Sequence, residues 1–182
     1  YPLQDEKVEY FGGSQEASIV ATVKLPAGDL IITGTHPGPP RTTSRIIRRN
    51  QQMSGIADYA ASLSVPHLVT GDLNSSSWSP FFQDWLRRSG MRDSRVGFGV
   101  QPTWPVDKQP LLRLAMSTTL DHVLVSPEVH VIARSTGAFT GVVPMNETGI
   151  HVKLMRDAVV STTAAATPTV VVAPSLMCIV AR

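Results

Sequence analysis

The sequence predicts an α/β fold in which β-sheets pack on each other and helices cover them from outside. Runs of β-branched residues occur in neighbouring pairs joined by short turns, a pattern typical of β-hairpins. Two longer segments carry apolar residues at helical spacing and are bounded by residues that cap helices. With 182 residues, the chain is long enough for one domain with a sizeable core.

The first predicted hairpin joins residues 17–25 (ASIVATVKL) to residues 29–36 (DLIITGTH) across a Pro-Ala-Gly turn. The segment HPGPPR follows, and two of its prolines are adjacent. Because proline fixes φ and has no N–H group to offer a neighbouring strand, His36 must leave the strand into a rigid loop.

Two further strand regions are predicted along the chain. Residues 67–71 (HLVTG) form a short buried strand. Residues 119–126 (TLDHVLVS) and 129–134 (VHVIAR) form a second hairpin around Pro127 and Glu128. The intervening GFGVQPTWPVDKQP is predicted to be loop.

Two helices are predicted to cover the sheets. The segment TTSRIIRRNQQMSGIADYAASL repeats apolar residues at helical spacing and starts with hydroxyl residues that can cap a helix. Its expected apolar stripe comprises Ile46, Met53, Ile56, Ala60 and Leu63. The second helix spans SPFFQDWLRRSG, with Ser79 as the N-cap, Pro80 at the first position and Gly90 as the stop.

Composition places the chain among globular proteins. Hydrophobic residues make up 42% and charged residues 16%, which excludes a disordered chain. The formal net charge of +2, with a sequence pI of about 8.9, is too small to argue for nucleic-acid binding by itself. The arginines form two clusters, which we interpret as solvated helix faces. They are Arg41, Arg45, Arg48 and Arg49, then Arg87, Arg88, Arg92 and Arg95.

The single cysteine, Cys178, excludes an internal disulfide framework. No apolar stretch reaches the roughly 18 to 20 residues of a membrane helix. The N-terminal YPLQDEKVEY has neither an initiator methionine nor the pattern of a signal peptide. We therefore expect an excised piece of a longer protein, whose targeting or membrane segments, if it has them, lie upstream and whose localisation is unknown.

Polar side chains gather at the ends of the predicted strands. His36 follows the first hairpin, and Asp72 and Asn74 follow the strand HLVTG. Asp121 and His122 lie in the strand TLDHVLVS. Taken singly, a histidine in a loop is more often structural, and Asp72 with Asn74 is as typical of a turn as of a site. If the strand ends meet, the same residues can perform acid–base chemistry.

The order of these motifs resembles the endonuclease/exonuclease/phosphatase superfamily, which includes the deoxyribonuclease I-like nucleases, sphingomyelinases and inositol polyphosphate phosphatases. The similar elements are GTHPGPP, RIIRRNQQM, VTGDLNSSSWSPF, GFGVQPTWP and LDHVLVS, over roughly residues 1–134. The nearest likeness is to the bacterial branch with membrane-anchored members. The resemblance implies two packed mixed β-sheets flanked by helices, a four-layer α/β sandwich that is incomplete here at its N-terminus.

The resemblance also implies hydrolysis of phosphodiesters or phosphomonoesters with Mg²⁺, or Mn²⁺, as cofactor. Asp72 then orients and deprotonates the attacking water and serves as a metal ligand. Asn74 and His36 are the donors that face the charge developing on the phosphoryl oxygens. Asp121 holds a later histidine in its catalytic tautomer, as a carboxylate does for a catalytic imidazole.

The implied partner is a phosphate-ester substrate: a nucleic acid, a phospholipid headgroup or an inositol phosphate, which loops distinguish in this superfamily. No obligate protein partner is evident. Thr103 and Trp104 lie in the loop that shapes the substrate groove of the family, although Trp104 is equally typical of loop packing. His122 points to the opposite side of its strand from Asp121 and is expected to be structural.

Two departures from the family pattern bear on activity. The metal-binding Asn and Glu of the superfamily lie upstream of the region present here, and Gln15 with Glu16 lies in a loop that does not match them. The family's G-S-D-H-x-P-V element is replaced by GAFTGVVPMNETGIHVKL, in which His151 is the only histidine. His151 is either a diverged catalytic histidine or follows a reading-frame shift near Ala138. The loss of period and charge there favours the frameshift.

We therefore predict a partial domain over residues 1–157, divergent or frameshifted over 134–157, and a low-complexity tail over 158–182. The predicted function is that of a metal-dependent phosphoesterase, with residues 1–182 alone inactive because the family's metal-binding Glu lies outside them. The alternative is a non-catalytic remnant that acts as a binding or membrane-tethered module. A third hypothesis is nucleic-acid binding through the arginine clusters, which salt-dependent binding without cleavage would support.

Overall fold

The computed structural model describes residues 1–104, 118–138, 148–156 and 169–172. The larger of its sheets has the strand order β1-β2-β3-β4-β6-β5, and the smaller has the order β7-β8-β9. The larger sheet comprises β1 (Leu3–Glu9), β2 (Ser18–Leu25), β3 (Gly28–Thr35), β4 (His67–Asp72), β5 (Arg92–Asp93) and β6 (Asp121–Val125). The smaller comprises β7 (Val129–Ala138), β8 (Thr148–Arg156) and β9 (Thr169–Val172).

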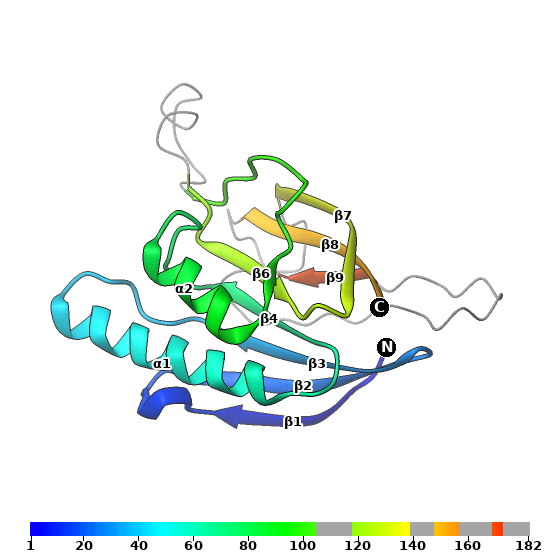
Figure 1. The fold of residues 1–182 in the computed structure, drawn as a ribbon, viewed down its shortest axis with the longest axis horizontal. Helices are drawn as coiled ribbons and strands as arrows, with labels where there is room; N and C mark the ends of the chain where they lie inside the picture. The colour runs from blue at the N-terminus through cyan, green and yellow to red at the C-terminus, as the bar shows by residue number, and fades with distance from the viewer. Residues whose placement is uncertain (105–117, 139–147, 157–168, 173–182) are drawn as a thin grey trace.

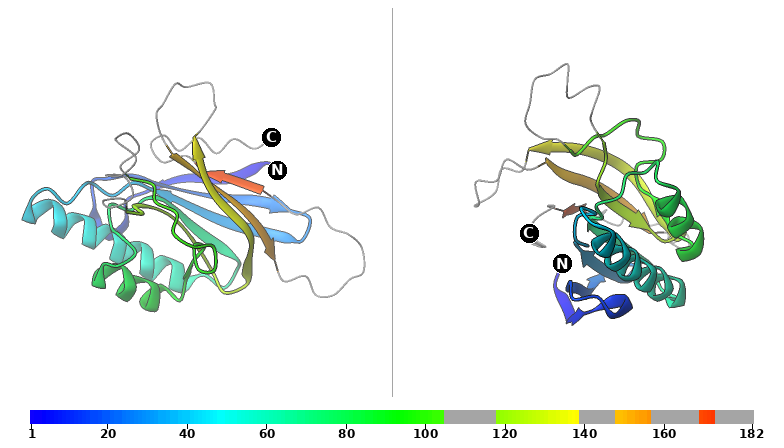
Figure 2. Two further views of the ribbon diagram at one scale, coloured as in Figure 1. Left: turned by 90° about the horizontal axis from the view of Figure 1, so that it is seen from above. Right: turned by 90° about the vertical axis from the view of Figure 1, so that its left-hand side faces the viewer.

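Helices α1 (Thr43–Ser62) and α2 (Pro80–Ser89) cover one face of the six-stranded sheet, and the three-stranded sheet lies on its other side (Figures 1 and 2). Apolar side chains fill both layers between them. The helix side contains Met53, Ile56, Ala57, Ala60, Val69, Leu73, Phe82, Trp85, Met91 and Leu124. The side facing the second sheet contains Val23, Leu30, Ile32, Leu68, Val123, Val125 and Val129. The arrangement is the predicted α/β sandwich of two sheets with helices outside.

The first predicted hairpin is confirmed. Strands β2 and β3 pair antiparallel in unbroken register from Ser18↔Thr35 to Leu25↔Gly28. Strand β3 then pairs in parallel with β4, and α1 forms the crossover between them. Because parallel neighbours point the same way, the C-terminal ends of β3 and β4 lie at the same edge of the sheet.

Both predicted helices are confirmed, with one local difference. Thr42 caps α1 by accepting a hydrogen bond from the Arg45 backbone N–H at 3.3 Å, and Gly90 ends α2 with a left-handed φ of 70°. Ile46 of the predicted apolar stripe is exposed, because the first turns of α1 extend beyond the strands (Figure 1). In the described part of the chain, neither helix is both long and apolar enough to cross a membrane.

The predicted hairpin between residues 119–126 and 129–134 is wrong. Strand β6 pairs with β4 and β5, whereas β7 pairs with β8 in the other sheet. The chain crosses between the sheets at a tight turn in which the Val129 N–H donates to the Ser126 carbonyl at 3.0 Å. Two apolar strands joined by a short turn can pair in one sheet or pack face to face from two sheets. Both arrangements bury the same apolar residues, so the local sequence pattern does not distinguish them.

Four strands, β1, β5, β8 and β9, lie in segments where no strand was predicted, and the two-residue β5 is found only through its pairing with β6. Strand β1 is a charged, exposed edge strand whose register with β2 shifts between Gln4 and Lys7. Strands β8 and β9 lie in the segments without a clear period, after residue 134. These segments are recognised as strands by their pairing with a neighbouring strand rather than by an alternation of apolar and polar residues along the sequence.

Candidate active site

The ends of three neighbouring strands bring the predicted catalytic side chains together. His36 follows the last residue of β3, and Asp72 is the last residue of β4. Strand β6 runs antiparallel to β4, so its first residue, Asp121, lies directly opposite Asp72 in the register. Residues that are up to 85 positions apart in the chain, from His36 to Asp121, therefore share one edge of the six-stranded sheet.

Gly71 allows β3 and β4 to approach each other closely at this edge. Its φ is 142°, and a Cβ atom placed on it would lie 1.8 Å from the Thr35 carbonyl oxygen. Only glycine adopts this conformation without strain. The approach places His36 Nε2 at 3.7 Å from Asp72 Oδ2, with the His36 side chain 53% exposed and that of Asp72 24% exposed.

Asn74 shapes the turn that follows β4. Its φ is 47°, and its backbone N–H donates to Asp72 Oδ1 at 2.8 Å. Its side-chain Nδ2 donates to the Pro37 carbonyl at 2.9 Å, which ties this turn to the loop that carries His36. Asp72 and Asn74 are thus turn formers, and the turn they form lies at the candidate site.

Arg49 of helix α1 contributes to this arrangement, although the sequence analysis had placed it on a solvated helix face. Its Nη1 donates to the Asn74 carbonyl at 2.6 Å, and its Nε and Nη2 donate to Asn50 Oδ1 at 3.1 and 2.9 Å. The guanidinium also lies over the Phe81 ring, 5.5 Å from its centroid. Burial lowers the pKa of Arg49 from its usual value, and Arg49 remains a cation at neutral pH. Arg49 fixes the position of Asn74.

Asp121 and Thr103 are both buried. The Thr103 hydroxyl oxygen accepts hydrogen bonds from the Leu120 and Asp121 backbone N–H groups, at 3.1 and 3.2 Å. Thr103 therefore holds the start of β6, and contact between Thr103 and a substrate stays a prediction. Trp104, by contrast, is 53% exposed and is anchored through its backbone to Thr118.

His122 supports the site from beneath. It is fully buried, and its Nε2–H donates to the Ser75 carbonyl at 2.8 Å. Its ring lies on Phe82 of α2, with ring centroids 4.4 Å apart. Burial lowers its pKa to about 4, although the Asp93 carboxylate, 4.0 Å from Nδ1, acts in the opposite direction. His122 is consequently neutral at pH 7 and holds the loop that follows Asn74, in keeping with the structural role expected for it.

His151 lies in β8, where its backbone is opposite Ser135 of β7 and Val171 of β9. Its side chain lies outside what the structure describes, so its catalytic role stays a prediction. Among the described residues, no group of three or more histidine, cysteine or acidic side chains is arranged to hold a metal ion.

Comparison with protein families places the chain beside a known family. The model of the Endonuclease/Exonuclease/phosphatase family matches residues 1–163. The matched range includes every residue of the candidate site, and it also includes β8. A search of curated proteins finds no match.

Solved structures with a similar fold come from bacteria and animals. An endonuclease/exonuclease/phosphatase from Beutenbergia cavernae superposes with a TM-score of 0.59 at 15% identity, over 86% of this chain and 55% of that protein. A family protein from Leptotrichia buccalis gives a TM-score of 0.61 at 14% identity, over 85% and 62%. TDP2 from D. rerio, complexed with a single-strand DNA product, gives 0.61 at 13% identity, over 84% and 68%. The chain thus spans little more than half the length of the first of these proteins.

Proposed function

Because the chain belongs to the endonuclease/exonuclease/phosphatase family, we propose that it forms part of a metal-dependent phosphoesterase that hydrolyses phosphodiesters or phosphomonoesters. The family includes hydrolases such as phosphodiesterases and nucleases, which makes hydrolysis the chemistry to test. The observation that carries the proposal is the meeting of His36, Asp72, Asn74 and Asp121 at one sheet edge.

Asp72 is the proposed general base. Water that attacks a phosphate ester must lose a proton while it adds to phosphorus and the ester P–O bond breaks, and a carboxylate that is partly exposed to solvent can accept that proton. Oδ1 of Asp72 is held by the Asn74 N–H and Oδ2 faces His36, so two contacts restrict the orientation of the carboxylate. A restricted base loses little conformational entropy when the substrate binds.

His36 and Asn74 are the proposed donors to the phosphoryl oxygens, on which negative charge develops during hydrolysis. Both lie on loops that other parts of the chain hold in place: Asn74 bonds to Pro37, and Arg49 bonds to Asn74. Asp121 is proposed to orient a histidine on a later strand, with His151 as the candidate in this sequence.

Among the side chains at this edge, Asp72 is the proposed ligand of a bound Mg²⁺ or Mn²⁺. These ions prefer oxygen ligands, and Mg²⁺ usually binds through one or two carboxylates while it keeps several waters and contacts substrate phosphate. Asp72 would hold the ion, which when bound polarises a phosphoryl oxygen as a Lewis acid. Its side chain is partly exposed to solvent, as a ligand to a partly hydrated ion must be.

The proposed substrate is a phosphate ester, and nucleic acid is the first class to test. TDP2, which shares the fold, was crystallised with a single-strand DNA product. Trp104 is exposed beside the buried Thr103 and is the proposed substrate contact of this loop, because an exposed indole can stack on a base. Phospholipid headgroups and inositol phosphates remain the other classes, and membership of a membrane-anchored branch stays a prediction.

The division of the chain is also proposed rather than tested. A family domain over residues 1–157 would end within the matched range of 1–163, and residues 158–182 would form a separate low-complexity tail. Strand β8 pairs with β7 along its length, so at least residues 148–156 complete a sheet with the preceding strand. Whether residues 134–157 are divergent or frameshifted stays a prediction.

A second candidate function is a binding module without catalysis. The observation in its favour is that Asp72 and Asn74 already bond to each other and to Pro37, so both side chains have a purely structural use in the fold. A module of this kind predicts substrate binding without turnover.

The test is the substitution Asp72→Asn in the whole protein that contains residues 1–182. Asparagine keeps a carbonyl oxygen for the Asn74 N–H but cannot accept a proton from water, so the turn should persist while turnover falls by about 10² to 10⁴. Hydrolysis of bis-(p-nitrophenyl) phosphate is measured with Mg²⁺ and with a chelator. The matched control is Asp84→Asn, on the exposed face of α2. Near wild-type turnover in a folded Asp72→Asn protein would remove Asp72 from the mechanism.

A further inference from the structure

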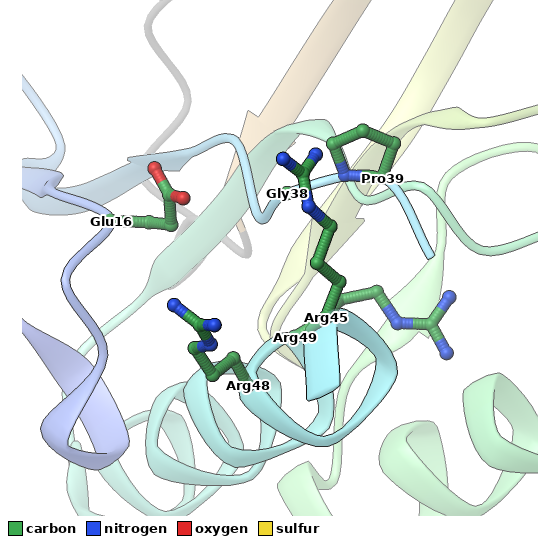
Figure 3. A pocket seen from close by; sticks show the side chains of 6 residues that line it. All are labelled: Glu16, Gly38, Pro39, Arg45, Arg48 and Arg49. Carbon is green, nitrogen blue, oxygen red and sulfur yellow. The ribbon is translucent and has the colours of Figure 1, made fainter. Parts of the chain in front are cut away.

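A positively charged pocket lies next to the candidate active site. Its volume is about 190 Å³. Figure 3 shows three arginine side chains that leave helix α1 in different directions, one of them toward the loop of Gly38 and Pro39, and Glu16 on the segment before β2. The lining residues are Glu16, Gly38, Pro39, Arg45, Arg48 and Arg49. The loop of Gly38 and Pro39 is the one that begins with His36, so one short segment borders both the candidate site and the pocket.

The charges in this pocket are not balanced. Three guanidinium groups face one carboxylate, that of Glu16. The side chains of Arg45 and Arg48 form no ion pair or hydrogen bond with any other residue that the structure describes. Arg45 also lies in the first turn of α1, where the partial positive charge of the helix dipole disfavours a cation. Neither arginine has an ion-pair partner in the described ranges of the chain, and an anion in the pocket would stabilise both.

We propose that this pocket is a second phosphate subsite, which binds a phosphate group of the substrate next to the one that is hydrolysed. The proposal rests on the function proposed above. It implies that the preferred substrates carry at least two phosphates, as a nucleic-acid strand or a small polyphosphorylated molecule does. The planar guanidinium fork binds phosphate oxygens in pairs, so Arg45 and Arg48 are the groups suited to this role.

Arg49 joins the subsite to the candidate active site. Its guanidinium is already bonded to the Asn74 carbonyl and to Asn50, so it lines the pocket as a fixed charge. Asn74 is itself the proposed donor to the reacting phosphoryl group. A substrate that bridges the two sites would therefore contact one connected set of side chains.

The negative charge of Glu16 is expected to weaken the binding of a phosphate in this pocket. Its Oε1 lies 3.5 Å from where a Cβ atom of Gly38 would be, and the backbone N–H of Glu16 donates to the Ser14 hydroxyl at 2.8 Å. A carboxylate in the lining of the pocket repels a phosphate. Replacing it with the neutral isostere, Glu16→Gln, should strengthen anion binding.

Binding tests the subsite without any need for turnover. The probe is a fluorescent phosphorothioate oligonucleotide, and inorganic pyrophosphate is the competitor that represents a small molecule with two phosphates. We expect Arg45→Gln with Arg48→Gln to weaken binding about tenfold or more, since hydrogen bonds to charged groups are lost. The salt slope of the binding constant should decrease by about 1.4, roughly 0.7 for each arginine on a single strand.

The matched control is Arg87→Gln with Arg88→Gln, which removes the same charge from α2. This control should leave both the affinity and the salt slope unchanged, and Glu16→Gln should raise the affinity. Competition by pyrophosphate would indicate a small polyphosphorylated ligand, whereas binding of the oligonucleotide alone would indicate a nucleic-acid strand. An equal loss of affinity in the Arg87/Arg88 control would overturn the proposal, because net charge rather than the pocket would then explain binding.

Kinetics separate this proposal from the function on which it rests. If the protein hydrolyses esters, the Arg45/Arg48 variant should raise KM much more for an oligonucleotide than for bis-(p-nitrophenyl) phosphate, which has one phosphate. Equal KM changes for the two substrates would overturn the subsite while leaving hydrolysis intact. If no substrate is hydrolysed but the binding differences hold, the proposed function fails and the anion site stands.

Discussion

The arginines at the start of helix α1 and those at the end of helix α2 look alike in the sequence but differ in the structure. On α2, Arg87 pairs with Asp84 at 3.0 Å and Arg88 pairs with Asp58 of α1 at 2.7 Å. Both also lie in the last turn, where the helix dipole favours cations. On α1, Arg45 and Arg48 have neither a charged partner among the described residues nor a favourable dipole.

The difference separates cations that the fold uses from cations that are available to a ligand. The remaining members of the second cluster are also engaged, since Arg92 donates to the Pro127 carbonyl at 2.8 Å and Arg95 lies 3.5 Å from Asp93. Arg49, in the first half of α1, bonds to Asn74 of the candidate active site, whereas Arg87 and Arg88 at the end of α2 pair with Asp84 and Asp58, which lie outside that site. Whether an arginine has an acidic partner in the structure therefore indicates its proposed role better than whether it lies in a cluster along the sequence.

The largest expected effect concerns two glycines, Gly71 of β4 at the candidate active site and Gly90 at the end of α2. Gly71→Ala should lower the free energy of unfolding by about 3 kcal/mol or more, because the new Cβ would overlap the Thr35 carbonyl oxygen and φ is 142°. Gly90→Ala at the end of α2 should cost only about 1 kcal/mol, since its φ is 70° and its Cβ position is open. Denaturant unfolding of both variants measures the difference. Equal costs would contradict the close approach of β3 and β4.

The next effect concerns His122, which bonds to Ser75 in the loop after β4 and packs on Phe82 at the start of α2. Because its folded-state pKa is lowered to about 4, the unfolded chain binds a proton below about pH 6.5 that the folded chain does not. Stability should be complete above pH 6.5 and should fall as the pH decreases toward 4, by on the order of 3 kcal/mol at most. Unfolding curves from pH 4 to 8 test this expectation.

A pair of variants assigns that pH dependence to His122. His122→Gln keeps an amide donor for the Ser75 carbonyl but does not titrate, so it should flatten the slope of stability against pH. His36→Gln, on the exposed side of the same site, should leave the slope in place. A slope that survives in His122→Gln would assign the dependence to another group.

The smallest effect concerns the ion pair between the helices. Arg88 bonds to both carboxylate oxygens of Asp58, but both side chains are exposed, so the pair should contribute only about 0.2 to 1 kcal/mol. A double-mutant cycle with Asp58→Ala and Arg88→Ala measures this coupling. Arg48→Ala is the matched change at the start of α1 and should leave stability unchanged within error. If Arg48→Ala lowered the free energy of unfolding more than Arg88→Ala, Arg48 rather than Arg88 would be the arginine that stabilises the fold.

Local patterns in the sequence were sufficient to predict the elements that depend on near neighbours. The β2–β3 hairpin follows from two β-branched runs and a short turn, and both helices follow from their caps and apolar spacing. The turn chemistry of Asp72 and Asn74 is equally local, because the two residues are two positions apart and the Asn74 N–H donates to the Asp72 carboxylate. Their position at strand ends was predicted for the same reason.

Only the tertiary structure determined how these elements meet. The same apolar run 129–134 suits a hairpin partner of β6 or a strand in the facing sheet, and only long-range pairing with β8 distinguishes the two. Arg49 bonds to a carbonyl 25 residues away and His122 to one 47 residues away, so no local pattern marks either as part of the site. The sequence likewise does not show that Arg45 and Arg48 lack an acidic partner among the described residues, because this depends on their distances to every other described element. Such distances arise from the packing of the whole fold, which periodicity and capping along one segment do not encode.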